Sequence, residues 1–393
     1  MSVVRGIGFE RLWLLGVVTA GHSVIHWYQQ LFSVILPSVK TGLSLNDVQV
    51  GALTTARQLA FGSLTLPSGM FADSFSYRRS LILASALLSM GLGYLLFGNV
   101  HLFIGAIIAS GLVGLGIALW HPAAMGSLAN RFPERRATAL AFHGVGATIS
   151  DTFTPLAAGA ILVIYPWRTV LEFQIVPALG IAIVIWLALR GVRTGSRSAS
   201  DGFSQVREIG RLARNPRFIA LAAANGLMQM GRLVILTFLP IYIQEHLGYT
   251  PLGLGFYLTL LHGLGIVSQP LLGYLSDWLG RRAVLLPSFF MLGILYGLIV
   301  PAEPGFQLGL VITTIGVFFY TLTNITAAGV MDVAGVRIQA SSFGLTSLVT
   351  QAIVLPTPIL AGYLVGVYGI ETAFFMSSAF LFLAAAVVMP LKL

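Results

Sequence analysis

The chain has 393 residues, of which 56% are hydrophobic and only 9% charged, with a formal net charge of +9. A soluble globular domain has about a quarter of its residues charged, so this composition excludes an ordinary soluble protein and indicates a chain that lies in lipid. Lipid offers backbone groups no water to pair with, so only helices or a closed barrel cross it. Apolar runs of about twenty residues without strict alternation exclude the barrel.

Twelve apolar runs are predicted as membrane-spanning helices, six in each half of the chain. Glycine is frequent, at 44 residues, as expected where membrane helices pack closely. Cysteine is absent, which excludes a disulfide framework and a thiolate metal site. The runs lie near residues 12–37, 48–71, 80–98, 102–128, 137–165, 169–190, 218–244, 252–275, 283–301, 307–331, 341–367 and 370–391.

The basic residues between the runs predict how the chain is oriented. One set of alternate connections holds nearly all of the arginines, including seven between residues 190 and 217, whereas the other set holds only Lys40 and Arg168. The positive-inside rule then places both termini in the cytoplasm, in a multi-pass protein of the cytoplasmic (inner) membrane. No cleavable signal peptide is expected, because the apolar run after Arg11 is too long. The net charge therefore reflects topology, and no nucleic-acid partner is expected.

The two halves of the chain carry an internal repeat. Gly-Met-Phe-Ala-Asp at 69–73 matches Gly-Tyr-Leu-Ser-Asp at 273–277, an offset of 204, and an Arg-Arg pair follows each copy. Thr-Pro-Leu-Ala-Ala-Gly at 154–159 matches Thr-Pro-Ile-Leu-Ala-Gly at 357–362, an offset of 203. Nearly equal offsets indicate a duplicated unit. We therefore predict an all-α membrane protein with two pseudo-symmetric six-helix bundles, at 1–190 and 217–393.

The segment between the bundles, 191–216, is predicted as a cytoplasmic linker. Val206, Ile209 and Ala213 recur in it at helical spacing, with arginines beside them. This pattern is typical of a short helix lying on the anionic inner leaflet. It equally fits a flexible tether whose arginines only enforce the topology, and the sequence favours neither reading.

The loop between the second and third spans of each half resembles a known signature. Gly-x-x-x-Asp-x-x-Gly-Arg-Arg, complete at 273–282, is similar to the loop of the major facilitator superfamily, while the first copy departs from it at Ser76 and Tyr77. The resemblance covers the whole chain. It implies a transporter with twelve helices in two parallel halves around a central cavity, the major facilitator fold.

The same loops contain the predicted gating residues. The glycines permit close helix packing, and the aspartates are expected near the N-terminus of a helix in the opposite half, where a carboxylate is favoured. The arginines complete a charge latch that breaks when the inner gate opens. Alternatively the arginines only anchor the topology, which leaves the aspartates unexplained. The set is Gly69, Asp73, Arg78, Arg79, Gly273, Asp277, Arg281 and Arg282.

Polar side chains inside the predicted spans are the candidates for the transport site, because such groups are costly in lipid. Asp151 is the one acidic residue placed clearly within a span, and Arg57 and Arg232 are the basic ones. The resemblance implies that the spans carrying these residues surround the cavity. The predicted substrate-binding residues are Arg57, Gln58, Tyr28, Gln30, His121, Asn225, Gln229, Arg232, His262, Asn324 and Gln351.

Two of these charges have predicted roles. Arg57 is expected to face an anionic group of the substrate, because a guanidinium is permanently charged. Asp151 is expected to carry a proton, with His22, His26 and His143 as relay. Alternatively Arg57 and Asp151 neutralise each other as a structural pair. The histidines and amides likewise have a plain reading as packing residues that tie helices together.

The first half has a closer resemblance, to fosmidomycin-resistance-type efflux proteins. It rests on His22 followed by Tyr-Gln-Gln at 28–30, on Val-Gly-Ala-Leu-Thr at 50–54, and on Trp-His-Pro at 120–122. The chain departs from that group at Ile25-His26, where Asn-Asp is usual. It also has Ser110 in place of the arginine, and Thr154 in place of the glycine, of proton-coupled drug antiporters. The resemblance implies proton-coupled efflux.

The sequence therefore predicts a secondary active transporter, and not an enzyme, that exports a small organic anion in exchange for protons as a monomer in the lipid bilayer. No Gly-x-x-x-x-Gly-Lys-Ser/Thr loop is present, so ATP is not expected to drive it. No cofactor and no resident metal are expected. The alternatives are uptake of an organic anion, divalent metal transport through His22, His26, Asp151 and His262, and a non-transporting membrane sensor or enzyme.

Overall fold

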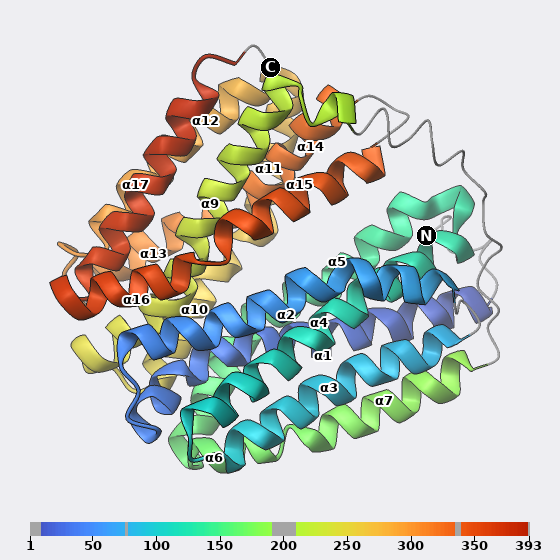
Figure 1. The fold of residues 1–393 in the computed structure, drawn as a ribbon, viewed down its shortest axis with the longest axis horizontal. Helices are drawn as coiled ribbons and strands as arrows, with labels where there is room; N and C mark the ends of the chain where they lie inside the picture. The colour runs from blue at the N-terminus through green and yellow to red at the C-terminus, as the bar shows by residue number, and fades with distance from the viewer. Residues whose placement is uncertain (1–8, 75–77, 191–209, 335–338, 392–393) are drawn as a thin grey trace. The chain divides into compact units, whose positions relative to one another are not determined.

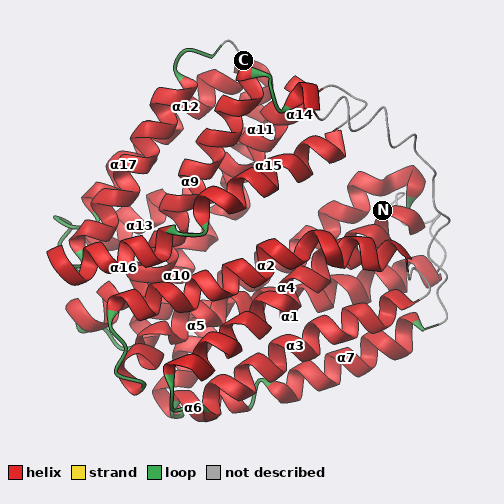
Figure 2. Ribbon diagram, viewed as in Figure 1, coloured by secondary structure: helices red, strands yellow, loops and turns green. Residues whose placement is uncertain are grey.

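The computed structural model describes residues 9–74, 78–190, 210–334 and 339–391, and helices make up nearly all of these residues (Figures 1 and 2). The described part contains no strand, as predicted. The helices of the first half are α1 (Phe9–Gly42), α2 (Asp47–Ser74), α3 (Arg79–Asn99), α4 (Phe103–Arg131), the short 3₁₀ helix η2 (Pro133–Arg135), α5 (Arg136–Ile164), α6 (Trp167–Glu172) and α7 (Ile175–Leu189).

The second half is built in the same way but with more interrupted helices. Short breaks separate α10 from α11, α13 from α14 and α15 from α16. Its helices are α9 (Pro216–Ile241), the π-helical turn η3 (Tyr242–His246), α10 (Pro251–Gly263), α11 (Gly265–Leu279), α12 (Arg281–Leu298), α13 (Phe306–Phe319), α14 (Thr321–Ala334), α15 (Gln339–Val354), α16 (Thr357–Tyr368) and α17 (Glu371–Val388).

All twelve predicted spans fall on these helices. Ten segments of the described chain are long and apolar enough to cross a membrane. The two others are α1 and α2, which are 34 and 28 residues long but less apolar, because they carry the polar residues singled out above. The all-helical membrane fold is therefore confirmed. Polar side chains within two long helices are the expected mark of a functional site in lipid.

The ends of several helices follow from local sequence. Asn215 accepts a hydrogen bond from the backbone N–H of Arg217 at the start of α9, and Thr250 does the same for Gly253 at the start of α10. A proline is the first residue of each helix, where its missing N–H costs nothing. Gly280, between α11 and α12, has a φ of +93°, a conformation that favours glycine. The second copy of the signature loop therefore favours glycine at this position, where the first copy has Ser76.

The chain divides into two compact units, which are described here one at a time. Unit 1 comprises residues 1–44 and 56–198, and unit 2 comprises residues 45–55 and 199–393. The linker predicted at 191–216 is described only from residue 210 onward. The choice between an interfacial helix and a tether therefore concerns residues that lie largely outside the described ranges.

In unit 1, α1 packs against α5, and α3 packs against α4 and α7. Two glycines bring helices into close contact with α1. A methyl group at Gly146 of α5 would lie 2.5 Å from the carbonyl oxygen of Thr19, and one at Gly21 of α1 would lie 2.2 Å from the ring of Trp120 on α4. Both distances are too short for a side chain, so α4 and α5 can approach α1 this closely only because glycine stands at these positions.

The packing in unit 2 repeats a crossing of unit 1, that of α2 with α4. Here α9 packs against α15 and α17, and α10 packs against α13. A methyl group at Gly316 of α13 would lie 2.6 Å from the carbonyl oxygen of Leu261 on α10. In unit 1 a methyl group at Gly114 of α4 would lie 2.2 Å from the carbonyl oxygen of Arg57 on α2. The two contacts are separated along the chain by nearly the offset of the sequence repeat, so the duplication is visible in the packing.

The contact at Gly146 can be tested by stability. We expect Gly146→Val to lower the free energy of unfolding by about 1–3 kcal/mol, because the added side chain forces α5 away from α1. The control is Gly144→Val in the same helix, where a methyl group would meet nothing within 4 Å. Thermal unfolding of the purified protein in detergent measures both variants. Equal transition temperatures in the two variants would contradict the close α1–α5 packing.

Candidate functional site

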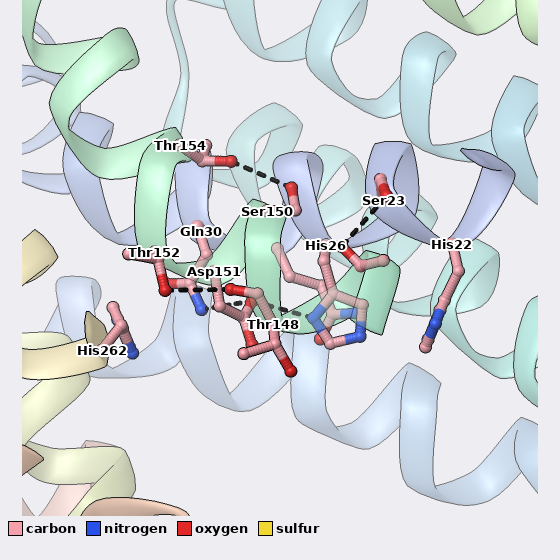
Figure 3. Close-up of polar contacts among 12 residues, drawn as sticks. His22, Ser23, His26, Gln30, Thr148, Ser150, Asp151, Thr152, Thr154 and His262 are labelled. Carbon is pink, nitrogen blue, oxygen red and sulfur yellow. Dashed lines mark hydrogen bonds and ion pairs between the residues drawn. The ribbon is translucent and has the colours of Figure 1, made fainter. Parts of the chain in front are cut away.

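The candidate site lies in unit 1, where polar side chains of α1 meet those of α5 (Figure 3). His22, His26 and Gln30 follow one another at four-residue spacing along α1, so they project from one face of that helix. His143 and Asp151 come from α5, which packs along the same face. All five side chains were predicted from the sequence as functional, and the fold brings them together.

The carboxylate of Asp151 is held by two donors from α1. Its Oδ1 atom lies 2.8 Å from Nδ1 of His26 and 2.8 Å from Nε2 of Gln30. The side chains of Asp151 and His26 are only 10% and 18% exposed. An ionised carboxylate only accepts hydrogen bonds, so His26 donates from Nδ1. A buried charge is tolerated only when it is paired in this way, and Figure 3 shows both α1 side chains directed at Asp151.

Four of the seven histidines form one cluster around this carboxylate. The ring of His22 stacks on that of His143 with centroids 3.8 Å apart, and lies edge-on to His26 at 4.6 Å. His121 of α4 completes the cluster, 5.4 Å from His22 and 6.1 Å from His26 between ring centroids. Lone buried histidines are ordinary packing residues, whereas four together on three helices need a functional explanation.

Arg57 of α2 lies against α1, and no carboxylate of the described residues is paired with it. Its guanidinium is 4.1 Å from the ring centroid of Phe32, and Nη1 is 3.4 Å from the backbone oxygen of Gln29. Among the described residues, no acidic side chain forms an ion pair with Arg57, so the alternative of a structural pair with Asp151 is not supported. A cation–π contact stabilises the charge without neutralising it. The positive charge is therefore available to an anion.

Unit 2 contains a comparable arginine. The guanidinium of Arg232 on α9 lies 4.2 Å from the ring centroid of Tyr320 and 4.7 Å from that of Phe319. The hydroxyl of Tyr320 is hydrogen-bonded to Nδ1 of His262 at 2.9 Å. Tyr320 therefore contacts both Arg232 and His262, which were both predicted as substrate-binding residues.

Several other predicted binding residues tie helices together. Asn225 donates to Thr350 at 2.8 Å. Asn324 donates to Gln269 at 2.9 Å. Tyr28 is fully buried and donates to the backbone oxygen of Gln174 at 2.7 Å, which fits a packing role. Three further candidates are half-buried: Gln58, Gln229 and Gln351. Their roles in binding stay predictions.

The gating loops are described more fully in unit 2. Arg281 binds Asp277 and lies 3.0 Å from Asp332 and 2.7 Å from Ser276. Asp332 was not singled out from the sequence, because it stands at the end of α14 with no motif around it. Gly273 and the exposed Arg282 belong to the same motif. The expected contact of Asp277 with a helix of the other half stays a prediction.

In unit 1 the corresponding loop is only partly described. Arg79 is buried and its Nε lies 3.3 Å from the backbone oxygen of Ala72, while Arg78 is exposed. A methyl group at Gly69 would lie 3.5 Å from Pro122, so α2 passes close to α4 there. The side chain of Asp73 lies outside the described residues, and its predicted part in the latch is therefore untested.

Sequence reasoning also missed the aromatic rings beneath the two arginines. Phe32, Phe319 and Tyr320 stand within apolar runs that read as ordinary membrane-facing sequence. Their contacts with Arg57 and Arg232 depend on how the helices cross. No local sequence pattern predicts such a contact, because the partners of Arg232 lie about ninety residues away along the chain.

Comparison with known proteins identifies the family. Residues 18–356, most of the chain, match the model of the Major Facilitator Superfamily. The chain therefore belongs to the major facilitator superfamily, and it is a multi-pass membrane transporter of small molecules rather than an enzyme. The resemblance read from the repeated loop is confirmed.

Two curated relatives are resistance proteins. Puromycin resistance protein pur8 of Streptomyces alboniger is 33% identical over 203 residues, which cover 51% of this chain and 39% of that protein. The fosmidomycin resistance protein of Escherichia coli (strain K12) is 25% identical over 209 residues, which cover 53% of this chain and 50% of that protein. The matched region thus spans half or less of the length of either relative. The predicted resemblance to fosmidomycin-resistance proteins is confirmed.

A solved structure matches the fold over nearly the whole chain. It is a bacterial homolog to the human lysosomal transporter Spinster, in an inward-facing and unoccupied conformation. The TM-score is 0.82, with 98% of this chain and 97% of that chain covered, at 16% sequence identity. At this identity the likeness establishes the fold alone, and it confirms the predicted twelve-helix architecture.

The hydrogen bond from Gln30 to Asp151 generates a stability prediction. We expect Gln30→Ala to lower the free energy of unfolding by about 1–3 kcal/mol, because a buried carboxylate loses one of its donors. The control is the neighbouring Gln29→Ala, since Nε2 of Gln29 is buried without a partner. Thermal unfolding in detergent distinguishes the two. A larger loss in the Gln29 variant would show that Gln30 does not hold Asp151.

Proposed function

We propose that this transporter exports a small organic anion across the cytoplasmic membrane by alternating access, in exchange for protons. The observation that carries the proposal is Arg57, a permanent positive charge inside unit 1 with an aromatic ring beneath it and no acidic partner among the described residues. An unpaired cation in lipid is costly, so its retention is explained best by a ligand that supplies the negative charge.

Arg232 supports the same substrate class from unit 2. It too rests on aromatic rings and forms no ion pair with a described carboxylate. A guanidinium binds carboxylate or phosphonate oxygens through two parallel hydrogen bonds. An anion with several acceptor oxygens suits both arginines.

For the coupling ion we propose the proton, with Asp151 as its carrier and His22, His26 and His143 as the relay. The support is positional: Asp151 is the acidic side chain that lies deep within a described span, His26 contacts it, and the rings of His22 and His143 continue from His26. A proton carrier inside a membrane has to exchange with its surroundings through groups of this kind.

The direction of transport is proposed from the relatives. The names of the two resistance proteins described above refer to puromycin in one and to fosmidomycin in the other, which favours export. The matched regions cover only half of each relative or less, so uptake of an organic anion is the alternative that the flux assay must separate. We also propose, from the distribution of arginines, that both termini are cytoplasmic, and that the transporter works as a monomer.

Substrate charge selectivity tests the role of Arg57. We expect Arg57→Gln to weaken the binding of an anionic substrate by about 10–100-fold, the worth of one hydrogen-bonded charge, and that of a neutral ligand far less. Arg190→Gln is the control, since Arg190 also lies near an aromatic ring, that of Trp186, but is exposed at the end of α7. Binding is measured by calorimetry with carboxylates and phosphonates. Equal losses for both ligand classes would make Arg57 structural.

Separating exchange from coupled transport tests the role of Asp151. We expect Asp151→Asn to abolish transport driven by a pH gradient in liposomes and to leave substrate-for-substrate exchange intact, because the amide keeps the shape but carries no proton. Glu172→Gln, at the end of α6, is the control and should transport normally. Full gradient-driven transport in the Asp151 variant would overturn the assignment.

A further inference from the structure

Three rings of the histidine cluster have the same nitrogen committed to an oxygen acceptor. Nδ1 of His26 faces the carboxylate of Asp151 at 2.8 Å, Nδ1 of His22 faces the backbone oxygen of His143 at 2.9 Å, and Nδ1 of His121 faces the backbone oxygen of Ile117 at 3.0 Å. The two carbonyls can only accept, as can the carboxylate of Asp151 while it is ionised, so each ring then donates from Nδ1. In a neutral imidazole the proton is then on Nδ1, and Nε2 carries a lone pair.

These lone pairs have few partners in the protein. His22 is only 6% exposed, and its Nε2 atom is buried and has no hydrogen-bond partner. An unsatisfied acceptor at such depth is costly. One ring nitrogen from each of His22, His26 and His121 lies within 4.8 Å of the other two. The cluster therefore presents imidazole ligands from two helices to one small region.

We propose that unit 1 contains a binding site for a divalent transition metal of the Zn²⁺ type, formed by Nε2 of His22, His26 and His121. Imidazole nitrogen is a preferred ligand of Zn²⁺, and three histidines with a fourth, open position form an established ligand set. Bonds of about 2.0–2.1 Å place tetrahedral ligand atoms roughly 3.4 Å apart. The ring nitrogens, which lie within 4.8 Å of one another, therefore need to approach by up to about 1.4 Å, through rotations of the side chains.

The surroundings of the three histidines match what metal-binding histidines require. A histidine that binds a metal almost always donates its other ring N–H to a carboxylate or a backbone carbonyl, which fixes its orientation. Here His26 donates to a carboxylate, and His22 and His121 donate to carbonyls. Asp151 is then an outer-shell residue and not a ligand. This site departs from the expectation of no resident metal, and its ligands are not the set considered for metal transport, which contained His262 of unit 2.

His143 is not among the proposed ligands. Its ring is stacked on that of His22 with an angle of 8° between the planes. Imidazole lone pairs lie in the ring plane, so two parallel rings direct theirs along separate parallel planes and not toward one point. His143 therefore serves as an internal control: it lies in the cluster and contacts His22 but does not contribute a ligand.

The site goes beyond the proposed function, since a bound metal is neither the exported anion nor the coupling proton, and His22 and His26 relay protons only while no metal is bound to them. His22 and His26 belong to α1 and His121 to α4, so a metal joins these two helices. Any ligand that binds only the folded state stabilises it by mass action. Zn²⁺ is therefore expected to raise the unfolding temperature of the protein in proportion to the logarithm of its concentration.

The test is titration of Zn²⁺ into the purified full-length protein, followed by calorimetry and thermal unfolding. The parent is the His101→Ala/His246→Ala variant, which removes two exposed histidines outside the cluster. We expect one equivalent to bind, with affinity more than about 100-fold lower in His121→Ala and 10–100-fold lower in Asp151→Ala, which loses an outer-shell partner. His143→Phe, which keeps the stacked ring, should bind within about threefold of the parent, on the argument that it supplies no ligand.

Two outcomes would overturn the proposal: no saturable binding to the parent, or equal binding by the parent and the His121 variant. Because a variant can fail to fold, X-ray absorption at the zinc edge of the unaltered protein provides a second measurement. It should show three imidazole nitrogens at about 2.0–2.1 Å, and one imidazole or none would refute the site. Arg57→Gln should bind Zn²⁺ normally, so failure of the metal site and failure of the anion proposal are separate results.

Discussion

A carboxylate inside a hydrocarbon environment has to be held by the protein itself, and the placement of Asp151 organises the first half of this transporter. Lipid offers no water to share the charge, so donors must come from a neighbouring helix. Here α1 supplies them at one-turn spacing, from His26 and Gln30. This requirement fixes the face that α1 turns toward α5. It also aligns the next histidine along α1, His22, with the carbonyl and ring of His143.

The close packing of three helices makes that arrangement possible. Gly146 lets α5 reach the backbone of α1, and Gly21 lets the ring of Trp120 on α4 lie against α1. His121 follows Trp120 directly in the chain, so the same contact that seats the tryptophan brings His121 to the cluster. Small residues at helix crossings are a general feature of membrane proteins, where packing replaces the hydrophobic effect as the attraction between helices. In this protein the crossings also determine which polar groups meet.

The two units each hold a half-buried arginine within the membrane-spanning part, and they stabilise its charge in the same way. Arg57 and Arg232 each lie over aromatic rings rather than beside a carboxylate. An aromatic face lowers the cost of the charge while leaving the guanidinium able to bind an anion. The units differ in where their acidic groups lie: in the described part of unit 2, Asp277 and Asp332 lie at the signature loop with Arg281. The histidine cluster around Asp151 belongs to unit 1.

The sequence alone determined the helices, the repeat and most of the candidate residues. Hydropathy, charge asymmetry and a repeated motif are local or periodic signals, so they predicted the spans and the family, and the cost of polar groups in lipid drew attention to His22, His26, Arg57 and Asp151. Only the tertiary structure decided the partners. Whether Asp151 meets Arg57 or His26, which nitrogen of each histidine is committed, and which rings lie beneath the arginines depend on how helices far apart in the chain cross. Those crossings are set by contacts such as that of Gly146 with Thr19, which no pattern within one helix contains.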